Sequence, residues 1–282
     1  MQKIENCQEI QALALAQRRA GKSIALVPTM GFLHDGHLEL MRQARKLADL
    51  VIVSIFVNPI QFGPNEDLDR YPRDLEGDLK KCEAVGVDLV FTPTPQSLYP
   101  DFFQTAVTVT EITKGLCGAG RPSHFQGVTT VVSKLFNLTL PDTAFFGEKD
   151  FQQLAVIRRM VTDLNFPIKI IGVPIVREKD GLAMSSRNAY LPGKERQEAA
   201  AIFAALSQAG SLYREGCRES EKLCQIVLEQ LEEKIKSPFR VEYIKLCETL
   251  NLTEINGLVK QPAVLLIAVH LAGTRLIDNL QL

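Results

Sequence analysis

The sequence has almost no excess charge of either sign, which argues against two kinds of general partner. Its 32 Lys and Arg residues nearly balance 33 Asp and Glu residues, for a formal net charge of −1. A chain that binds nucleic acid or an anionic membrane through its overall charge carries a clear basic excess. We therefore expect neither nucleic acid nor a membrane as a partner.

Long hydrophobic runs, repeats and paired cysteines are also missing. No window approaches the roughly 18 apolar residues of a membrane span, and the first residues lack the basic-then-apolar layout of a signal peptide. The six cysteines, at positions 7, 82, 117, 217, 224 and 247, include no Cys-x-x-Cys pair and indicate reduced thiols. These absences predict a cytoplasmic globular protein, and 282 residues suffice for one large domain or two moderate ones.

Strands and helices alternate through the first part of the chain. Apolar and β-branched runs predict strands over 23–28, 50–57, 88–91, 105–109, 143–146 and 168–173. Periodic patterns predict helices over 7–20, 74–85, 123–138 and 150–163, one more that begins near His37, and a flexible stretch over 115–122. Such alternation is typical of a mostly parallel α/β sheet with right-handed crossovers.

The pattern changes after Pro192. Two long helical patterns, 193–215 and 218–236, precede strand-like residues 241–246 and 263–270. Neither helix leads through a short crossover into a buried parallel strand. We therefore expect a larger domain over 1–175 and a smaller α+β domain over 176–282.

One strand-to-helix turn, Pro28 to His37, combines glycines with histidines. Gly31 and Gly36 remove side chains where a nucleotide must come close, and the first N–H groups of the helix point toward phosphate. His34 and His37 are three residues apart, so both can project from one helical turn and donate to developing negative charge. A surface helix face or a zinc site is the alternative, but zinc needs further ligands and none lies at ligand spacing nearby. The turn predicts a nucleotide site.

Three further loops, 58–74, 147–153 and 176–188, leave the expected carboxyl ends of strands, where loops of a parallel sheet converge. The run Gly147 to Asp150 offers a glycine, a cation for phosphate and a carboxylate for a ribose hydroxyl or a metal. The alternative interpretation of this run is a solvated turn with a helix cap. The run Met184 to Arg187 offers a second phosphate-binding segment. The alternative interpretation is an exposed polar loop.

Six blocks of sequence together resemble the pantothenate synthetase family, also called pantoate–β-alanine ligase. The resemblance covers nearly the full chain in the family's order, and the six blocks together are highly specific. A block such as the paired histidines alone is shared with the wider nucleotidyltransferase superfamily. The blocks are Pro28–His37 (PTMGFLHDGH), Val57–Gly63 (VNPIQFG), Asp69–Arg73 (DRYPR), Arg121–Phe125 (RPSHF), Phe146–Asp150 (FGEKD) and Met184–Asn188 (MSSRN).

The resemblance implies a Rossmann-like parallel sheet of the nucleotidyltransferase superfamily with a smaller C-terminal α+β lid domain. It implies an ATP-dependent ligase in which the carboxylate of pantoate attacks the α-phosphate and pyrophosphate leaves. The amine of β-alanine then opens the pantoyl adenylate to give pantothenate and AMP. Mg²⁺ is expected with ATP, and a homodimer is expected to form through the larger domain.

The resemblance also implies roles for single residues. Four are expected to be catalytic: His34, His37 as proton donor, Lys149 and Arg187. The expected ATP-binding residues are Met30, Gly31, Phe32, Leu33, His34, Asp35, Gly36, His37, Gly147, Glu148, Lys149, Asp150, Val176, Met184, Ser185, Ser186 and Arg187. The expected substrate-binding residues are Gln61, Gln153, Asn58 and Arg121. Some relatives carry consecutive acids where this chain reads Glu76-Gly77-Asp78, so Asp78 is the matching carboxylate for Mg²⁺.

Two other functions are alternatives. A different nucleotidyltransferase, acting on a phosphorylated acceptor, needs cations where this chain has Gln61 and Gln153, whose amides suit hydroxyl and carboxylate groups. A non-catalytic nucleotide-binding module binds ATP without releasing pyrophosphate. Both histidines, Lys149 and Arg187 argue against such a module, because binding alone does not need a full clamp for the transition state.

Overall fold

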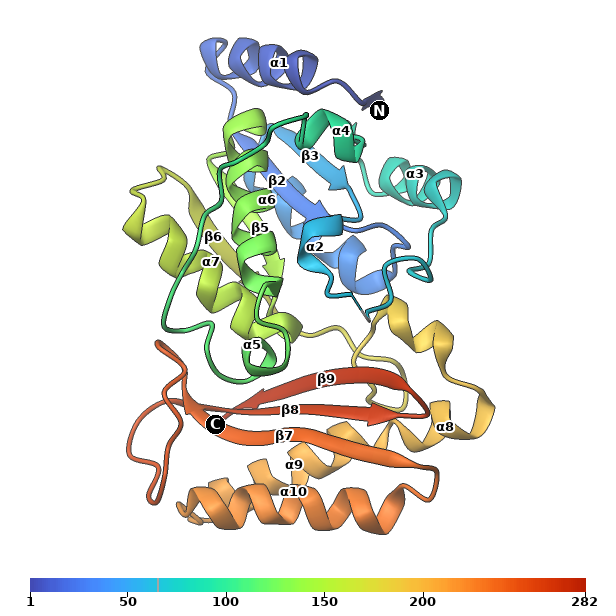
Figure 1. Ribbon diagram of the computed structural model, residues 1–282, viewed down its shortest axis with the longest axis vertical. Coiled ribbons are helices and arrows are strands. Elements are labelled where there is room, and N and C mark those ends of the chain that lie inside the picture. Colours follow the sequence, from blue (N-terminus) through green and yellow to red (C-terminus); the bar gives the residue numbers. More distant parts are fainter. Residues whose placement is uncertain (65) are drawn as a thin grey trace. The chain divides into compact units, whose positions relative to one another are not determined.

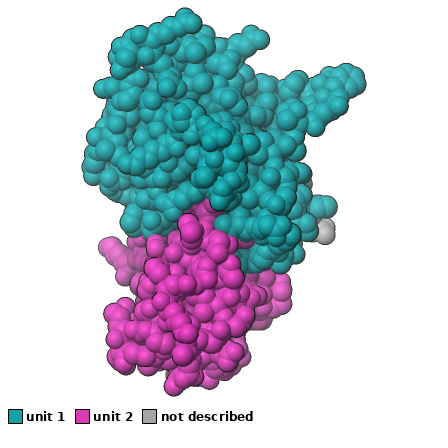
Figure 2. Space-filling model, turned by 90° about the vertical axis from the view of Figure 1, so that its left-hand side faces the viewer, with its two compact units in different colours: residues 1–148, 156–174 teal, residues 149–155, 175–282 magenta. Residues whose placement is uncertain are grey.

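The computed structural model describes residues 1–64 and 66–282. The chain divides into two compact units, coloured separately in Figure 2. Unit 1 comprises residues 1–148 and 156–174, and unit 2 comprises 149–155 and 175–282. No helix in the described part of the chain is long and apolar enough to cross a membrane.

Unit 1 is built on a six-stranded sheet in which every pair of neighbouring strands is parallel (Figure 1). Its strands lie in the order β1-β4-β3-β2-β5-β6. This confirms the expected parallel α/β sheet, although β1 was not predicted. The bounds are β1 Gln2–Ile4, β2 Ile24–Thr29, β3 Leu50–Ile55, β4 Leu89–Phe91, β5 Thr143–Gly147 and β6 Lys169–Val173.

The strand order places the turn after β2 at a special point of the sheet. From β2 the chain proceeds outward through β3 and β4, and it then returns to place β5 on the other side of β2. Connections therefore diverge between β2 and β5, and parallel sheets bind ligands at the carboxyl ends of strands where this happens. The first four residues of β2 are fully buried, which fixes the strand as the centre of the core.

The predicted helices of unit 1 are present within a few residues of their expected ends. α1 is capped by Asn6, whose side chain accepts hydrogen bonds from the backbone N–H groups of Gln8 and Glu9. The helices are α1 Cys7–Arg19, α2 Asp35–Leu47, η1 Pro59–Gln61, α3 Leu75–Ala84, α4 Pro95–Leu98, α5 Cys117–Gly120, α6 His124–Thr139, and, continuing into unit 2, η2 Glu148–Asp150 and α7 Phe151–Asp163.

The prediction of a strand over 105–109 is wrong, because this segment bonds to a helix and not to another strand. The backbone N–H of Val107 donates to the hydroxyl of Thr130 at 3.0 Å, and its carbonyl accepts from the hydroxyl of Thr129. Both threonines lie on α6, so the segment is tied to a helix by side chains and joins no sheet. The stretch 115–122, expected to be flexible, contains the short helix α5.

Unit 2 consists of an antiparallel sheet, in the order β7-β8-β9, that packs against helices. This confirms the smaller α+β part of the expected fold class. One predicted helix, 193–215, is instead two helices that meet at a turn at Ala199 and Ala200. The elements are η3 Ser186–Tyr190, α8 Gly193–Glu198, α9 Ala201–Arg214, α10 Ser220–Lys234, β7 Phe239–Glu248, β8 Ala263–Leu271 and β9 Thr274–Gln281.

Candidate functional site

The turn between β2 and α2 has an unusual backbone. Gly31 has φ +82° and Phe32 has φ +49°, so two consecutive residues lie in the left-handed region. A Cβ at position 31 would lie 3.0 Å from the Asp78 carboxylate and 3.0 Å from Ile55, which explains the glycine. Phe32 has a side chain and is strained in this conformation, so neighbouring groups must hold it there.

Asp78 holds this turn. It lies on α3 and is 1% exposed, and its two carboxylate oxygens accept hydrogen bonds of 2.7 Å from the backbone N–H groups of Phe32 and Leu33. Lys81, one turn later, donates to the carbonyl of Leu33 at 2.8 Å. Burial raises the pKa of Asp78, while the two backbone hydrogen bonds act in the opposite direction. Successive N–H groups around one anion form a nest, and here the anion belongs to the protein.

These contacts argue against the expected Mg²⁺ ligation by Asp78. Both oxygens already accept short bonds from the chain, and the group is buried under the turn. Among residues 1–64 and 66–282, no group of three or more His, Cys, Asp or Glu side chains is placed to hold a metal ion. Both oxygens of Asp78 are therefore engaged by the turn, and no step of the proposed reaction passes through a protein-held Mg²⁺.

His34 and His37 face each other across the start of α2. His34 is the N-cap residue, and its Nδ1 accepts from the backbone N–H of Gly36 at 3.2 Å. The Nδ1 of His37 accepts from the backbone N–H of His34 at 3.3 Å, and the ring centroids are 4.0 Å apart. Because Nδ1 is an acceptor in both rings, the neutral imidazoles carry their proton on Nε2. The helix start therefore presents two Nε2–H donors together with its positive dipole end.

Gln61 lies in the loop that leaves β3 and is held on several sides. Asn58 donates to the side-chain oxygen of Gln61 at 3.1 Å and to the carbonyl of Gly127 at 3.1 Å, and Tyr99 donates to Asn58 at 2.8 Å. The Gln61 amide nitrogen lies 3.1 Å from the sulfur of Met30. Asn58 is 1% exposed, and its bond to the side-chain oxygen orients Gln61. Burial raises the pKa of Tyr99, which keeps its hydroxyl protonated as a donor.

Arg121 is paired with an acid from the same loop. Its guanidinium donates two hydrogen bonds to the carboxylate of Glu66, one of them from Nε at 2.8 Å. Burial alone would raise the pKa of Glu66, but the hydrogen bonds and charge of Arg121 hold that pKa below its usual range. Arg121 therefore braces the loop that carries Gln61.

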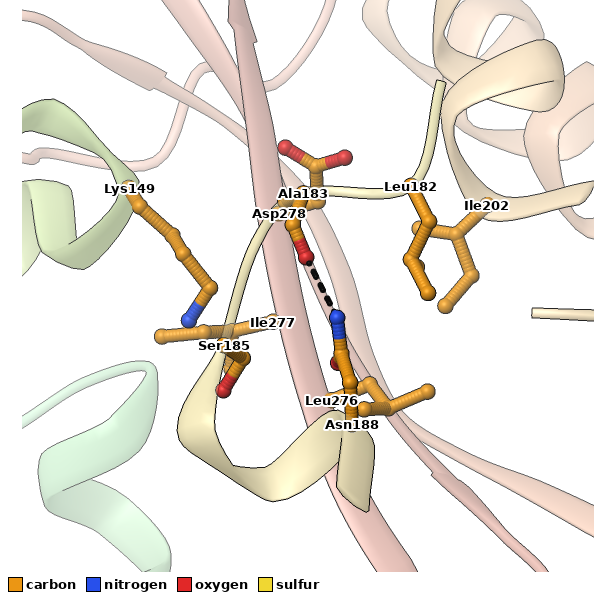
Figure 3. Close-up of a pocket in the computed structure, with 9 residues that line it drawn as sticks. All are labelled: Lys149, Leu182, Ala183, Ser185, Asn188, Ile202, Leu276, Ile277 and Asp278. Atoms are coloured by element: carbon orange, nitrogen blue, oxygen red, sulfur yellow. Dashed lines mark hydrogen bonds between the residues drawn. The ribbon is translucent and has the colours of Figure 1, made fainter. Parts of the chain in front are cut away.

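Unit 2 contains the remaining predicted site residues. Residues 176–184 form a hairpin in which the N–H of Met184 donates to the carbonyl of Val176 at 3.0 Å. Ser185 then caps η3 by accepting from the N–H of Arg187 at 3.2 Å. Lys149, Ser185 and Asn188 line one small cavity, and Figure 3 shows the Lys149 side chain extending toward Ser185.

The predicted site residues thus fall into two groups, one in each unit. Unit 1 brings together the turn, its histidines and Gln61, and it also contains Gly147 and Glu148, at the end of β5. Unit 2 contains Lys149, Asp150, Gln153, Val176 and Met184–Arg187. Three supporting residues were missed: Lys81, Tyr99 and Glu66. Each acts through a partner at least 41 positions away in the chain, so no local pattern marks them.

Comparison with known proteins gives one family. The model of the pantoate-beta-alanine ligase family matches residues 2–281. A pantothenate synthetase from Geobacter sulfurreducens is 53% identical over 99% of this chain and 98% of its own length. One from Myxococcus xanthus is 54% identical over 94% of this chain and 90% of its own length.

Solved structures agree with the sequence matches. A pantothenate synthetase from Thermus thermophilus superimposes with a TM-score of 0.93 at 42% identity, over 99% of each chain. A pantoate-beta-alanine ligase from Francisella tularensis, complexed with beta-gamma ATP and beta-alanine, gives a TM-score of 0.81 at 32% identity over 99% of this chain and 97% of that one. The chain is therefore an enzyme that belongs to the pantoate–β-alanine ligase family, as its six sequence blocks predicted.

Proposed function

We propose that this ligase condenses (R)-pantoate with β-alanine through a pantoyl adenylate, with release of pyrophosphate and AMP. The observation that carries the proposal is the arrangement of His34 and His37 at the start of α2, after the central strand, where the Nδ1 of each ring accepts a backbone hydrogen bond. Charge develops on the α-phosphate and on the leaving pyrophosphate during adenylation. Fixed donors at that position lower the barrier more than mobile water does.

Gln61 is proposed to orient pantoate. Asn58 donates to its side-chain oxygen, which directs the amide nitrogen, a donor, toward the turn at Met30. A donor of fixed orientation suits the attacking carboxylate, and Asn58 and Tyr99 reduce the entropy lost when the substrate binds. Gln153, on α7, is proposed as a second pantoate contact, and Arg121 as a brace.

Residues of both units are proposed to bind ATP. The set in unit 1 is Met30–His37 with Gly147 and Glu148, and the set in unit 2 is Lys149, Asp150, Val176 and Met184–Arg187. Lys149 and Arg187 supply positive charge for the phosphates. Acyl adenylates hydrolyse readily, so we propose that residues 176–282 act as a lid that excludes water. Mg²⁺ is expected as a counter-ion of ATP.

We also propose a homodimer formed through unit 1, in the cytoplasm. Residues 104–110 form no backbone–backbone hydrogen bond within the described part of the chain, and the backbone of Val107 bonds to two side chains of α6. A β-prone segment whose backbone groups are not paired in a sheet can pair with a second copy of itself. All six cysteines are free thiols, which fits a reducing compartment.

Pyrophosphate release tests the reaction. The enzyme is mixed with ATP and Mg²⁺, then with pantoate, and β-alanine is added last. We expect one stoichiometric burst with pantoate and continuous release after β-alanine. The absence of pantoate-dependent release, in spite of measurable ATP binding, would contradict the adenylate route and favour a nucleotide-binding module.

A further inference from the structure

Strand β9 carries two adjacent buried polar residues that the proposed reaction does not use. Asp278 and Asn279 are each 3% exposed. Successive side chains of a strand point to opposite faces of the sheet, so the two residues serve different neighbours. Buried polar groups persist in a fold when specific partners satisfy them, and here each partner belongs to a segment with a proposed role at the phosphates of ATP.

Asp278 holds the hairpin over 176–184. Its carboxylate accepts from both terminal nitrogens of Arg177, at 2.7 and 3.0 Å, and from the backbone N–H of Asn279 at 2.8 Å. Arg177 also donates to the carbonyl of Gly181 at 3.1 Å and stacks on Phe203, with its guanidinium carbon 3.7 Å from the ring centroid. The planar fork of an arginine fixes direction as well as distance. The base of the hairpin is therefore fixed seven residues before Met184.

Asn279 holds the other segment. Its side-chain amide donates to the backbone carbonyl of Lys149 at 3.1 Å. This bond orients the peptide that follows Lys149 and so fixes the point from which the lysine side chain starts. Lys149, Ser185 and Asp278 line the same cavity, so both segments lie beside β9 (Figure 3).

We propose that Asp278 and Asn279 are positioning residues that tie both phosphate-binding segments of unit 2 to one strand. Asp278 acts through Arg177 on Met184–Arg187, and Asn279 acts through the carbonyl of Lys149. The inference rests on the proposed function, because it assumes that these segments bind ATP.

Asn279→Leu tests the inference, because leucine keeps the size of the side chain and removes the donor. Gln281→Leu is the matched control: it removes an amide two residues later, on the same side of β9, at an exposed position. We expect Asn279→Leu to weaken ATP binding in calorimetry and to raise KM for ATP about 10- to 100-fold, the cost of a misplaced binding group. KM for β-alanine should match that of the control, whereas the melting temperature should be lower in Asn279→Leu because the carbonyl of Lys149 loses its donor.

The Arg177–Asp278 pair gives a second, independent arm. Asp278→Asn and Arg177→Met should each weaken ATP binding, and the double variant should lose less than the sum of the two single losses, because both remove the Arg177–Asp278 contact. Unchanged ATP affinity in Asn279→Leu, an equal loss in Gln281→Leu, or additive losses for the pair would overturn the inference. If Asn279→Leu does not fold, Asn279→Ser removes the same bond with a smaller side chain. Failure of the wild type to release pyrophosphate, with ATP binding intact, would instead contradict the proposed function.

Discussion

In unit 1, a buried carboxylate holds the turn after β2 by binding backbone N–H groups, whereas in unit 2 a buried carboxylate holds a hairpin by binding a guanidinium. Asp78 accepts from Phe32 and Leu33, and Asp278 accepts from Arg177. A side-chain substitution other than to proline leaves backbone donors in place, so loss of Asp78 removes the acceptor of two N–H groups. A guanidinium can be removed together with its acid, and a buried pair replaced as a unit often costs little.

The two arrangements also differ in what they stabilise. The Asp78 contact fixes a strained conformation, since both Gly31 and Phe32 have positive φ. The Asp278 contact fixes the direction of an otherwise ordinary hairpin. We therefore expect substitutions at the Asp78 contact to affect the chemical step and those at the Asp278 contact to affect mainly ATP binding or stability.

The largest effect is expected at the histidine pair of unit 1. In His37→Asn, the Oδ1 atom can take the place of Nδ1 and accept from the N–H of His34, but the Nε2–H donor is lost. We expect kcat to fall about 10²- to 10³-fold, as for other fixed donors to developing charge. The unfolding free energy should stay within about 0.5 kcal/mol of wild type, whereas His37→Ala should lose about 1 kcal/mol with the cap. A kcat near wild type in His37→Asn would remove His37 from the chemistry.

Asp78→Asn should give the next largest effect. An amide can accept from one N–H group but presents its NH₂ to the other, so the turn at Phe32 and Leu33 loses its nest. We expect kcat/KM for ATP to fall about 10²-fold and stability to fall about 2 kcal/mol. Asp74→Asn is the control, because Asp74 is the N-cap of the same helix and accepts from the N–H of Gly77.

The Mg²⁺ dependence of Asp78→Asn separates the two roles considered for this residue. A positioning residue leaves the Mg²⁺ concentration for half-maximal rate unchanged. A shift of that concentration in Asp78→Asn but not in Asp74→Asn would indicate that Asp78 is a metal ligand. It would then no longer be true that Asp78 acts only by holding the turn.

Two glycines, one beside each carboxylate contact, give a further test of the difference between the two units. Gly31 has φ +82° and Gly181 has φ +93°, so alanine is strained at both positions and each substitution should cost about 1–3 kcal/mol. A new Cβ at 31 would press on the Asp78 carboxylate, and one at 181 would lie 2.6 Å from the ring of Phe203. We expect Gly31→Ala to lower kcat and Gly181→Ala to raise KM for ATP, measured by steady-state kinetics. The same change in both variants would show that the two contacts do not differ in function.

Local patterns in the sequence were sufficient for the central features of unit 1. The apolar run of β2, the two glycines and the spacing of His34 and His37 are all local, and the structure has the strand, turn and helix that they predict. The contact of Asp78 with Phe32 joins residues 46 positions apart, and only the folded sheet brings them together. The sequence shows only that residue 78 is a carboxylate, which is a common metal ligand, and this led to the Mg²⁺ prediction.

Two errors in secondary structure have the same cause. Residues 105–109 have the β-branched composition of a strand, but the structure gives their backbone a helix as neighbour instead of another strand. No strand was predicted over β9, which contains the polar residues Arg275, Asp278 and Asn279. Partners elsewhere in unit 2 satisfy these side chains and allow their burial, and no pattern within β9 reveals those partners.

The smallest effect is expected on the sheet of unit 2, where Glu242 accepts from Arg275 at 2.8 and 2.9 Å and lies 3.0 Å from His270. Burial would raise the pKa of Glu242, but Arg275 and His270 hold it below its usual value. A lowered pKa in the folded state contributes stability above the unfolded pKa of about 4.3, and that contribution is lost as pH falls through the folded pKa. Glu242→Gln should therefore cost about 1 kcal/mol at pH 7 and progressively less in acid, measured by urea unfolding. Glu254→Gln, in an exposed pair with Lys245, should cost less at every pH, and an equal cost would mean that burial adds nothing to the Glu242 contacts.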